Sequence, residues 1–139
     1  MNETRTIKLL RISYWTGAIF DALVLLPMLS PRIASTAFGI PDFNPEADYK
    51  YAMYIAASLM LGWIFLLLWA DRKPVERRGV LLLTIFPVLV GLIISGTLAV
   101  NSTLISFADM IPTWIMQVVL VLLFGFSYLS ASHAEVTAR

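Results

Sequence analysis

The chain contains no cysteine, and its single histidine is His133, in the polar C-terminal segment. The absence of cysteine excludes disulfides, thiol nucleophiles and thiolate metal ligands. One histidine leaves too small a ligand set for zinc or copper, so we expect no metal site and no cofactor. Charge is also scarce, because only 14% of the 139 residues are charged, against about 25% in a soluble domain.

Four long apolar stretches fill most of the chain, which is 59% hydrophobic. They cover roughly residues 7–29, 51–70, 79–100 and 110–129. A helix needs about 20 apolar residues to cross the ~30 Å hydrocarbon core of a bilayer. The pattern therefore predicts an all-α polytopic membrane protein, an up-down bundle of four transmembrane helices that forms one domain over residues 1–139.

The longest connection lies between the first two stretches. Ser30 before Pro31 is typical of a helix start, since proline favours the first helical position, and Gly39 fits the left-handed residue that ends many helices. The sequence predicts a short interfacial helix between the first two spans, over residues 31–38, followed by a turn-rich run over residues 40–45.

Small residues and one proline suggest how the spans pack. Without a hydrophobic force between helices in lipid, small side chains favour close approach. Pro87 is expected to kink the third span because it removes a backbone hydrogen bond. The expected small-residue positions are Ser13 and Gly17 with Asp21, Ala18 and Ala22, Ser58 and Gly62, and Gly91 and Ser95 with Ala99.

The basic residues predict the orientation. With an even number of spans, eight of the ten Lys and Arg residues fall on one side, leaving Arg32 and Lys50 for the other. The positive-inside rule then predicts a multi-pass protein of a bacterial inner (plasma) membrane with both termini in the cytoplasm. The aromatic belts expected on this topology are Tyr14, Trp15, Trp69 and Tyr128 at the inner interface and Tyr49, Tyr51, Tyr54 and Trp114 at the outer one.

Four of these basic residues cluster between the second and third spans: Arg72, Lys73, Arg77 and Arg78. A cation near the membrane surface contributes about 1 kcal/mol of attraction to anionic lipids. We expect the cluster to contact anionic headgroups as well as to fix the orientation. The acidic residues of the opposite side, Asp42, Glu46, Asp48 and Asp109, match no calcium-binding loop and are interpreted as solvated loop charges.

Asp21 is the one carboxylate inside an apolar stretch. An ionised carboxylate at the centre of a transmembrane helix costs about 2.5–3.5 kcal/mol on insertion scales. The second, third and fourth stretches contain no Lys or Arg to pair with it. We therefore expect Asp21 to be neutral and hydrogen-bonded, or solvated by water, or bound to a cation.

Helix rise predicts which polar residues share the depth of Asp21. Counted from the outer ends of the helices, Asp21, Ser58, Ser95 and Gln117 all lie about 9–13 Å deep, and Thr113 is one turn from Gln117. In one interpretation these residues line an outward-facing pocket for a lipidic or small apolar ligand, or carry a proton or ion step. In the other, Asp21 and Gln117 form a buried interhelical hydrogen bond. The sequence leaves both open.

No catalytic or nucleic-acid motif is present. The chain has no Gly-rich phosphate loop, no H-E-x-x-H, no nucleophile elbow and no basic nucleic-acid stripe. An enzyme is therefore a less favoured function class than a binding protein or a transporter, and we expect no nucleic-acid partner. The first hypothesis is a non-enzymatic membrane protein that binds a lipidic ligand or acts as an accessory subunit. Its partners would be membrane lipids, a hydrophobic small molecule or a larger complex. The second hypothesis is a proton- or ion-coupled transporter that works as a homo-oligomer.

Single residues and short motifs in the first 80 residues resemble those of a broad set of small bacterial four-helix membrane proteins of unassigned function. They are Asp21, Pro31, Phe38-Gly39-Ile40-Pro41, Gly62, Ala70-Asp71-Arg72-Lys73-Pro74 and Arg78-Gly79-Val80-Leu81. Asp21 before Pro27 is similar to the first span of the EXPERA group of sterol isomerases and sigma-2 receptors. Spans two and three lack that group's acids and histidine, so this resemblance implies binding of an apolar ligand and no sterol chemistry.

Overall fold

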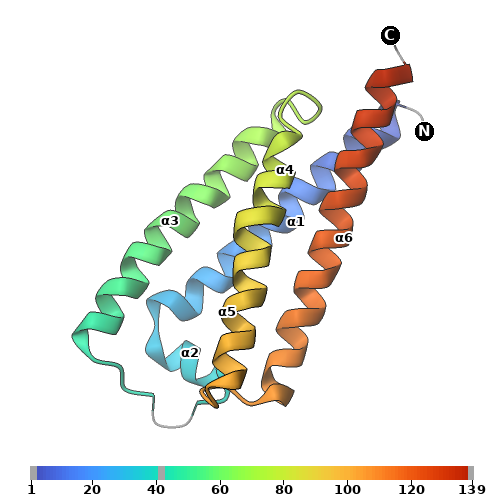
Figure 1. Ribbon diagram of the computed structural model, residues 1–139. Coiled ribbons are helices and arrows are strands. Elements are labelled where there is room, and N and C mark those ends of the chain that lie inside the picture. Colours follow the sequence, from blue (N-terminus) through green and yellow to red (C-terminus); the bar gives the residue numbers. More distant parts are fainter. Residues whose placement is uncertain (1–2, 41–42, 138–139) are drawn as a thin grey trace.

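The protein is described by a computed structural model that covers residues 3–40 and 43–137, with all side chains there except those of Glu3, Phe38 and residues 134–137. These residues form helices joined by loops, with no strand in the described part of the chain (Figure 1). The elements are α1 (Glu3–Leu29), α2 (Pro31–Phe38), α3 (Ala47–Asp71), α4 (Gly79–Leu83), the π-helix η1 (Thr84–Leu89), α5 (Val90–Asn101) and α6 (Phe107–Thr137).

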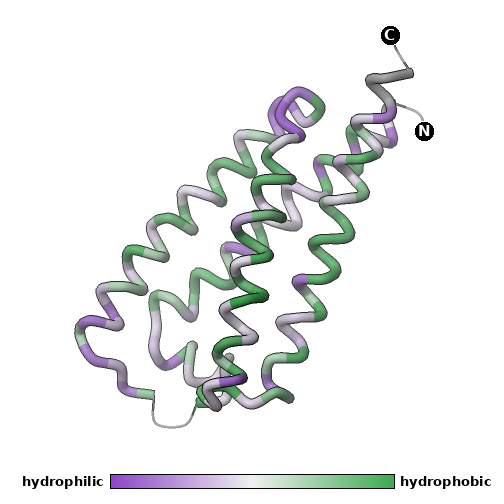
Figure 2. The backbone as a smooth tube through the Cα atoms, viewed as in Figure 1, coloured by the Kyte–Doolittle hydropathy of each residue, from purple (hydrophilic) through white to green (hydrophobic). Residues whose placement is uncertain are grey.

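Four helical segments are long and apolar enough to cross a membrane, as the sequence predicts. They run over Thr4–Leu29, Ala47–Asp71, Gly79–Asn101 and Phe107–His133, the third being continuous through α4, η1 and α5. Hydrophobic residues follow these helices along their length, and hydrophilic residues gather in the loop between α3 and α4 (Figure 2). The all-α four-helix fold is confirmed, and the chain has the features of a multi-pass membrane protein.

The helices alternate in direction, so the bundle has two chemically different ends. The start of α1, the end of α6 and the loop of residues 72–78 lie at one end, which we call the basic end (Figure 1). The opposite end, which we call the acidic end, carries α2, the start of α3 and the loop between α5 and α6 (Figure 1).

Helix α1 is the centre of the bundle, because it packs against both α3 and α6. Helix α6 in turn packs against α4, η1 and α5. The largest fully buried apolar side chains lie in the half of the bundle near the basic end: Leu10, Tyr14, Leu67, Leu81 and Phe124. By contrast, α5, in the half near the acidic end, has no buried residue.

Two hydrogen bonds between polar side chains link helices in the half near the basic end. The hydroxyls of Ser13 and Ser127 lie 2.7 Å apart, which links α1 to α6. The indole Nε1 of Trp63 donates to Thr84 Oγ1 at 3.3 Å and so links α3 to η1. Tyr14, expected in an aromatic belt, is fully buried instead, and its hydroxyl donates to the Pro74 carbonyl at 3.2 Å.

Among the glycines within the four spans, Gly17 and Gly96 lie against neighbouring helices. A Cβ on Gly17 would lie 3.0 Å from the Phe124 ring and 3.1 Å from Leu67, so α1 approaches α6 and α3 here. A Cβ on Gly96 would lie 3.3 Å from Trp114 Nε1. The predicted contacts at Gly62 and Gly91 are wrong, because no atom of another helix lies within 4 Å of a Cβ placed there.

The third span is irregular at Pro87, where the sequence predicts a kink. Residues Thr84–Leu89 form a π-helix around this proline. Proline has no backbone N–H to donate and clashes with the preceding turn, and a π-turn is one way in which a helix accommodates such a defect. The irregular turn separates α4, which packs against α6, from the loosely packed α5.

The short helix α2 has the predicted bounds, begins with Pro31 and ends at Gly39, whose φ is +64°. Glycine adopts this left-handed conformation without steric cost. A Cβ on Gly39 would also meet the Asp109 carboxylate at 2.8 Å, so the end of α2 lies against the start of α6. Pro41 and Asp42, part of the predicted turn-rich run, lie outside the described residues.

Candidate functional site

Asp21 lies on α1 one turn from Gly17, toward the acidic end. Residues four apart share a helix face, so Asp21 follows the face on which Ser13 and Gly17 are buried against other helices. The side chain is half-buried, and its Oδ2 atom is shielded from solvent by the protein. Asp21 is therefore directed at least partly into the bundle, as the stripe of Ser13, Gly17 and Asp21 predicts.

Two side chains of α6 complete a polar cluster in the half near the acidic end. Gln117 is only 3% exposed. Trp114 lies one turn earlier on the same face of α6, with its indole Nε1 packed against Gly96 of α5. We call Asp21, Trp114 and Gln117 the polar triad.

The packing of α1 on α6 places the triad in one half of the bundle, over about two helical turns. Ser13 meets Ser127, and Gly17 meets Phe124, which fixes an antiparallel register. Continuing this register by one turn places Asp21 next to Leu120, and Gln117 about one turn, or about 5 Å, closer to the acidic end. Beyond this level α1 leans toward α3 and away from α6 (Figure 1).

Each member of the triad has a buried polar atom without a hydrogen-bond partner among the described residues. These atoms are Oδ2 of Asp21, Nε1 of Trp114 and Oε1 of Gln117. The hydrogen bond between Asp21 and Gln117, which one interpretation of the sequence required, is not formed through these two oxygens. In an apolar medium an unpaired polar group costs several kcal/mol. The triad is therefore an unsatisfied site with one N–H donor and two side-chain oxygens.

Two further atoms of this kind lie near the basic end, and their surroundings differ. Asp71 Oδ1 is 3.8 Å from Arg11 Nε, so an ion pair accounts for it. The other carboxylate oxygen of Asp71 accepts a hydrogen bond from Trp15 Nε1 at 3.3 Å. Thr6 Oγ1 is a single hydroxyl without such company. Neither forms a cluster comparable with the triad.

The structure does not bring all predicted residues to Asp21. Ser58 is exposed on α3 and donates to the Ile55 carbonyl of its own helix at 2.8 Å. Ser95 is exposed on α5. Thr113 is half-buried on α6, one turn from Gln117. Of the four residues predicted to accompany Asp21, Gln117 is the one that is buried, about one turn closer to the acidic end.

Trp114 is the member of the triad that the sequence does not indicate as a site residue. Its place near the end of a span predicts an aromatic belt residue instead. The available signal was its spacing of three residues from Gln117, which places both side chains on one helix face.

The predicted anionic-lipid cluster is partly occupied by contacts within the protein. The Arg77 guanidinium lies 3.4 Å from the centre of the Trp69 ring and donates to the Trp69 carbonyl. Arg78 donates to the Val75 carbonyl at 3.2 Å. Lys73 pairs with Glu76 at 2.8 Å, and the hydrogen bond and charge of Lys73 lower the pKa of the Glu76 carboxyl. Arg72 is exposed.

Among the described residues, no three His, Cys, Asp or Glu side chains come together as a metal site would require. The chemistry of the triad is that of hydrogen bonding, through a carboxyl, an amide and an indole N–H.

Comparison with protein-family models, curated proteins and solved structures found no match to this chain. The resemblances described above therefore stay predictions, and function is argued from the site.

Proposed function

We propose that this protein is a non-enzymatic membrane protein that binds a lipidic or small apolar ligand at the polar triad. The observation that carries the proposal is the set of three buried, unpaired polar atoms on α1 and α6. Unpaired groups at this depth are stabilised by any molecule that supplies the missing hydrogen bonds.

The triad favours a ligand with an apolar body and one polar group that both donates and accepts. Trp114 Nε1 can only donate, the Gln117 amide oxygen only accepts, and a neutral carboxyl at Asp21 does both. A hydroxyl group suits each of the three, because it can donate to an oxygen and accept from the indole N–H. The largely apolar helix surfaces around the triad fit an aliphatic body.

The proposed orientation follows from the basic residues and places both termini in the cytoplasm of a bacterial cell. The triad then lies in the outer half of the inner membrane. A ligand of this kind would enter from the outer leaflet or from the outer surface.

A bromine-substituted long-chain alcohol tests the proposal, because bromine quenches tryptophan fluorescence on contact and Trp114 is part of the site. We expect saturable quenching of the detergent-purified protein, with binding weakened tenfold or more in Asp21→Leu and Gln117→Leu. Ser58→Ala and Ser95→Ala are matched controls, since both hydroxyls are exposed at a similar depth. Equal binding by the wild type and both leucine variants would overturn the proposal.

The alternative function is a proton- or ion-coupled carrier acting as a homo-oligomer. It is favoured by one observation, that Asp21 is the one carboxylate inside the four apolar stretches. A carrier predicts flux into vesicles that Asp21→Asn abolishes and Gln117→Leu leaves largely intact. Ligand binding predicts no such flux and losses in both variants.

A further inference from the structure

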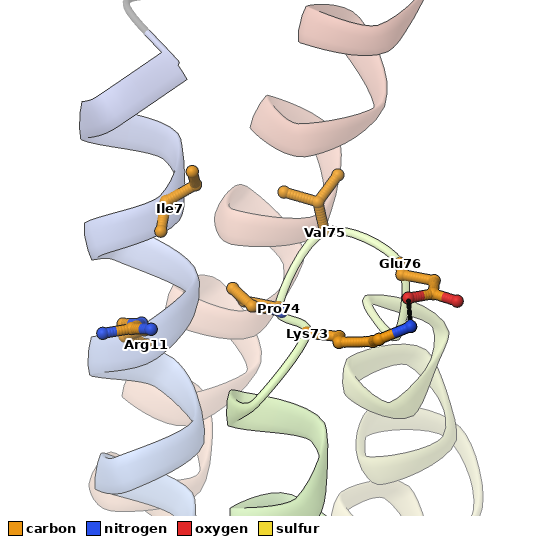
Figure 3. A pocket seen from close by; sticks show the side chains of 6 residues that line it. All are labelled: Ile7, Arg11, Lys73, Pro74, Val75 and Glu76. Atoms are coloured by element: carbon orange, nitrogen blue, oxygen red, sulfur yellow. Dashed lines mark ion pairs between the residues drawn. The ribbon is translucent and has the colours of Figure 1, made fainter.

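A second candidate site lies at the basic end, between α1 and the loop of residues 72–78. A surface depression of about 320 Å³, open to the surroundings, lies there, and we call it the cavity (Figure 3). Its walls come from Ile7 and Arg11 on α1 and from Lys73, Pro74, Val75 and Glu76 in the loop. It combines two cations with an apolar wall, and it lies at the opposite end of the bundle from the triad.

Both cations lie at the surface of the protein. The side chains of Arg11 and Lys73 are each 58% exposed. Arg11 approaches Asp71 only through Nε, at 3.8 Å, which is longer than a hydrogen bond. The terminal amino groups of Arg11 therefore have no hydrogen-bond partner among the described residues and can bind a phosphate oxygen pair in the bidentate manner typical of arginine.

Lys73 forms an ion pair with Glu76, which would compete with a bound anion for the lysine. Its ammonium group contacts Glu76 and is turned away from α1 (Figure 3). Exposed ion pairs of this kind stabilise a protein little, and lysine has a long flexible stem. A phosphate in the cavity can therefore draw the ammonium group away from the Glu76 carboxylate.

The surroundings place the cavity at the level of lipid headgroups. Trp15, one turn from Arg11, and Trp69, at the end of α3, are both about half exposed, as aromatic residues at a membrane interface are. This favours a membrane lipid over a soluble anion.

We infer that this cavity binds the phosphate of an anionic phospholipid from the leaflet around the basic end, through Arg11 and Lys73, with Glu76 as an internal competitor for Lys73. The assignment differs from the predicted cluster, in which Arg77 and Arg78 are engaged within the protein. It does not depend on the proposed function of the triad.

The experiment is a titration of the detergent-purified full chain with phosphatidylglycerol and with phosphatidylcholine, followed by native mass spectrometry. Phosphatidylglycerol should bind more tightly, and Arg11→Gln and Lys73→Gln should each weaken it about fivefold. Arg72→Gln is the matched control, because it removes the same charge from the same loop outside the cavity, and it should change binding less than twofold. Glu76→Gln should tighten binding.

The inference is overturned if Arg72→Gln weakens binding as much as Lys73→Gln, or if Glu76→Gln weakens it. If Arg11→Gln does not fold, the opposite effects of Lys73→Gln and Glu76→Gln still decide the matter. A free-anion arm compares sodium phosphate with sodium chloride at equal ionic strength. Selective displacement of phosphatidylglycerol by phosphate would assign the cavity to a soluble anion and contradict the lipid.

Discussion

Ser13 and Ser127 hydrogen-bond to each other across α1 and α6, whereas Asp21 and Gln117, further along the same two helices, leave buried oxygens unpaired. The two halves of the bundle also differ in packing. Near the basic end the helices close around fully buried side chains, while α5 in the other half has none. The half near the basic end is stabilised by close packing and by hydrogen bonds between helices. The half near the acidic end contains the triad, whose buried polar atoms are unpaired. Stability that is given up at such positions is typical of binding sites.

The close packing near the basic end can be tested at a glycine. The largest effect on thermal stability is expected at Gly17. Replacing Gly17 by leucine forces a side chain against Phe124 and Leu67, which lie 3.0 and 3.1 Å from its Cβ position. Overpacking of this kind costs about 1–3 kcal/mol or more, so we expect the thermal midpoint in detergent to fall by about 5 °C or more.

Gly62→Leu is the control for this prediction, because its Cβ would meet nothing within 4 Å. It adds the same side chain to a helix face that is open to the surroundings. A midpoint as low as that of Gly17→Leu would mean that the half near the basic end is no more tightly packed than the exposed helix faces.

A smaller effect is expected at the hydrogen bond between α1 and α6. Ser127→Ala removes one partner of the 2.7 Å contact with Ser13, and a lost buried hydrogen bond costs about 1 kcal/mol. Scanning calorimetry should show a midpoint lower by about 2–4 °C. Ser95→Ala, at an exposed serine, should stay within about 1 °C of the wild type. Equal shifts in the two variants would deny Ser127 a role in cohesion.

The smallest effect concerns the ion pair of Lys73 and Glu76. Because the folded-state pKa of Glu76 is lowered below its ordinary value of 4.5, its contribution to stability is present above 4.5 and is lost as the pH falls through the lowered pKa. The pair is exposed, so wild type and Glu76→Gln should differ by less than about 2 °C at pH 7 and should converge at acidic pH. A difference that grows on acidification would have the wrong sign.

Sequence patterns predicted the fold well because the determining signals are local. The length of each apolar stretch limits it to a spanning helix, and Pro31 and Gly39 mark the ends of α2. Sequence patterns predicted poorly which small residues contact a neighbouring helix. Gly62 and Gly91 contact no neighbouring helix while Gly96 does, because a small residue tolerates lipid as well as protein and its direction depends on helices distant in sequence.

The site was predicted in part for a similar reason. Asp21 and Gln117 were found from depth alone, since long polar side chains in a span tend toward the interior. Ser58 was misplaced because a serine hydroxyl can bond to its own helix carbonyl, as it does to Ile55, and so has no need of an interior position. Trp114 was missed because tryptophan is also at home at the interface, and its packing on Gly96 is a tertiary contact.

The central claim is that the triad near the acidic end contains unpaired polar atoms that bind a ligand. Its most direct test is the thermal midpoint of Gln117→Leu, measured in detergent after extraction of bound lipid. Leucine fills similar space without the unpaired Oε1 atom, so the variant should unfold about 3 °C or more above the wild type, while it binds the bromo-alcohol tenfold or more weakly. A midpoint below that of the wild type would mean that Gln117 is already satisfied within the bundle, and the binding site at the triad would be contradicted.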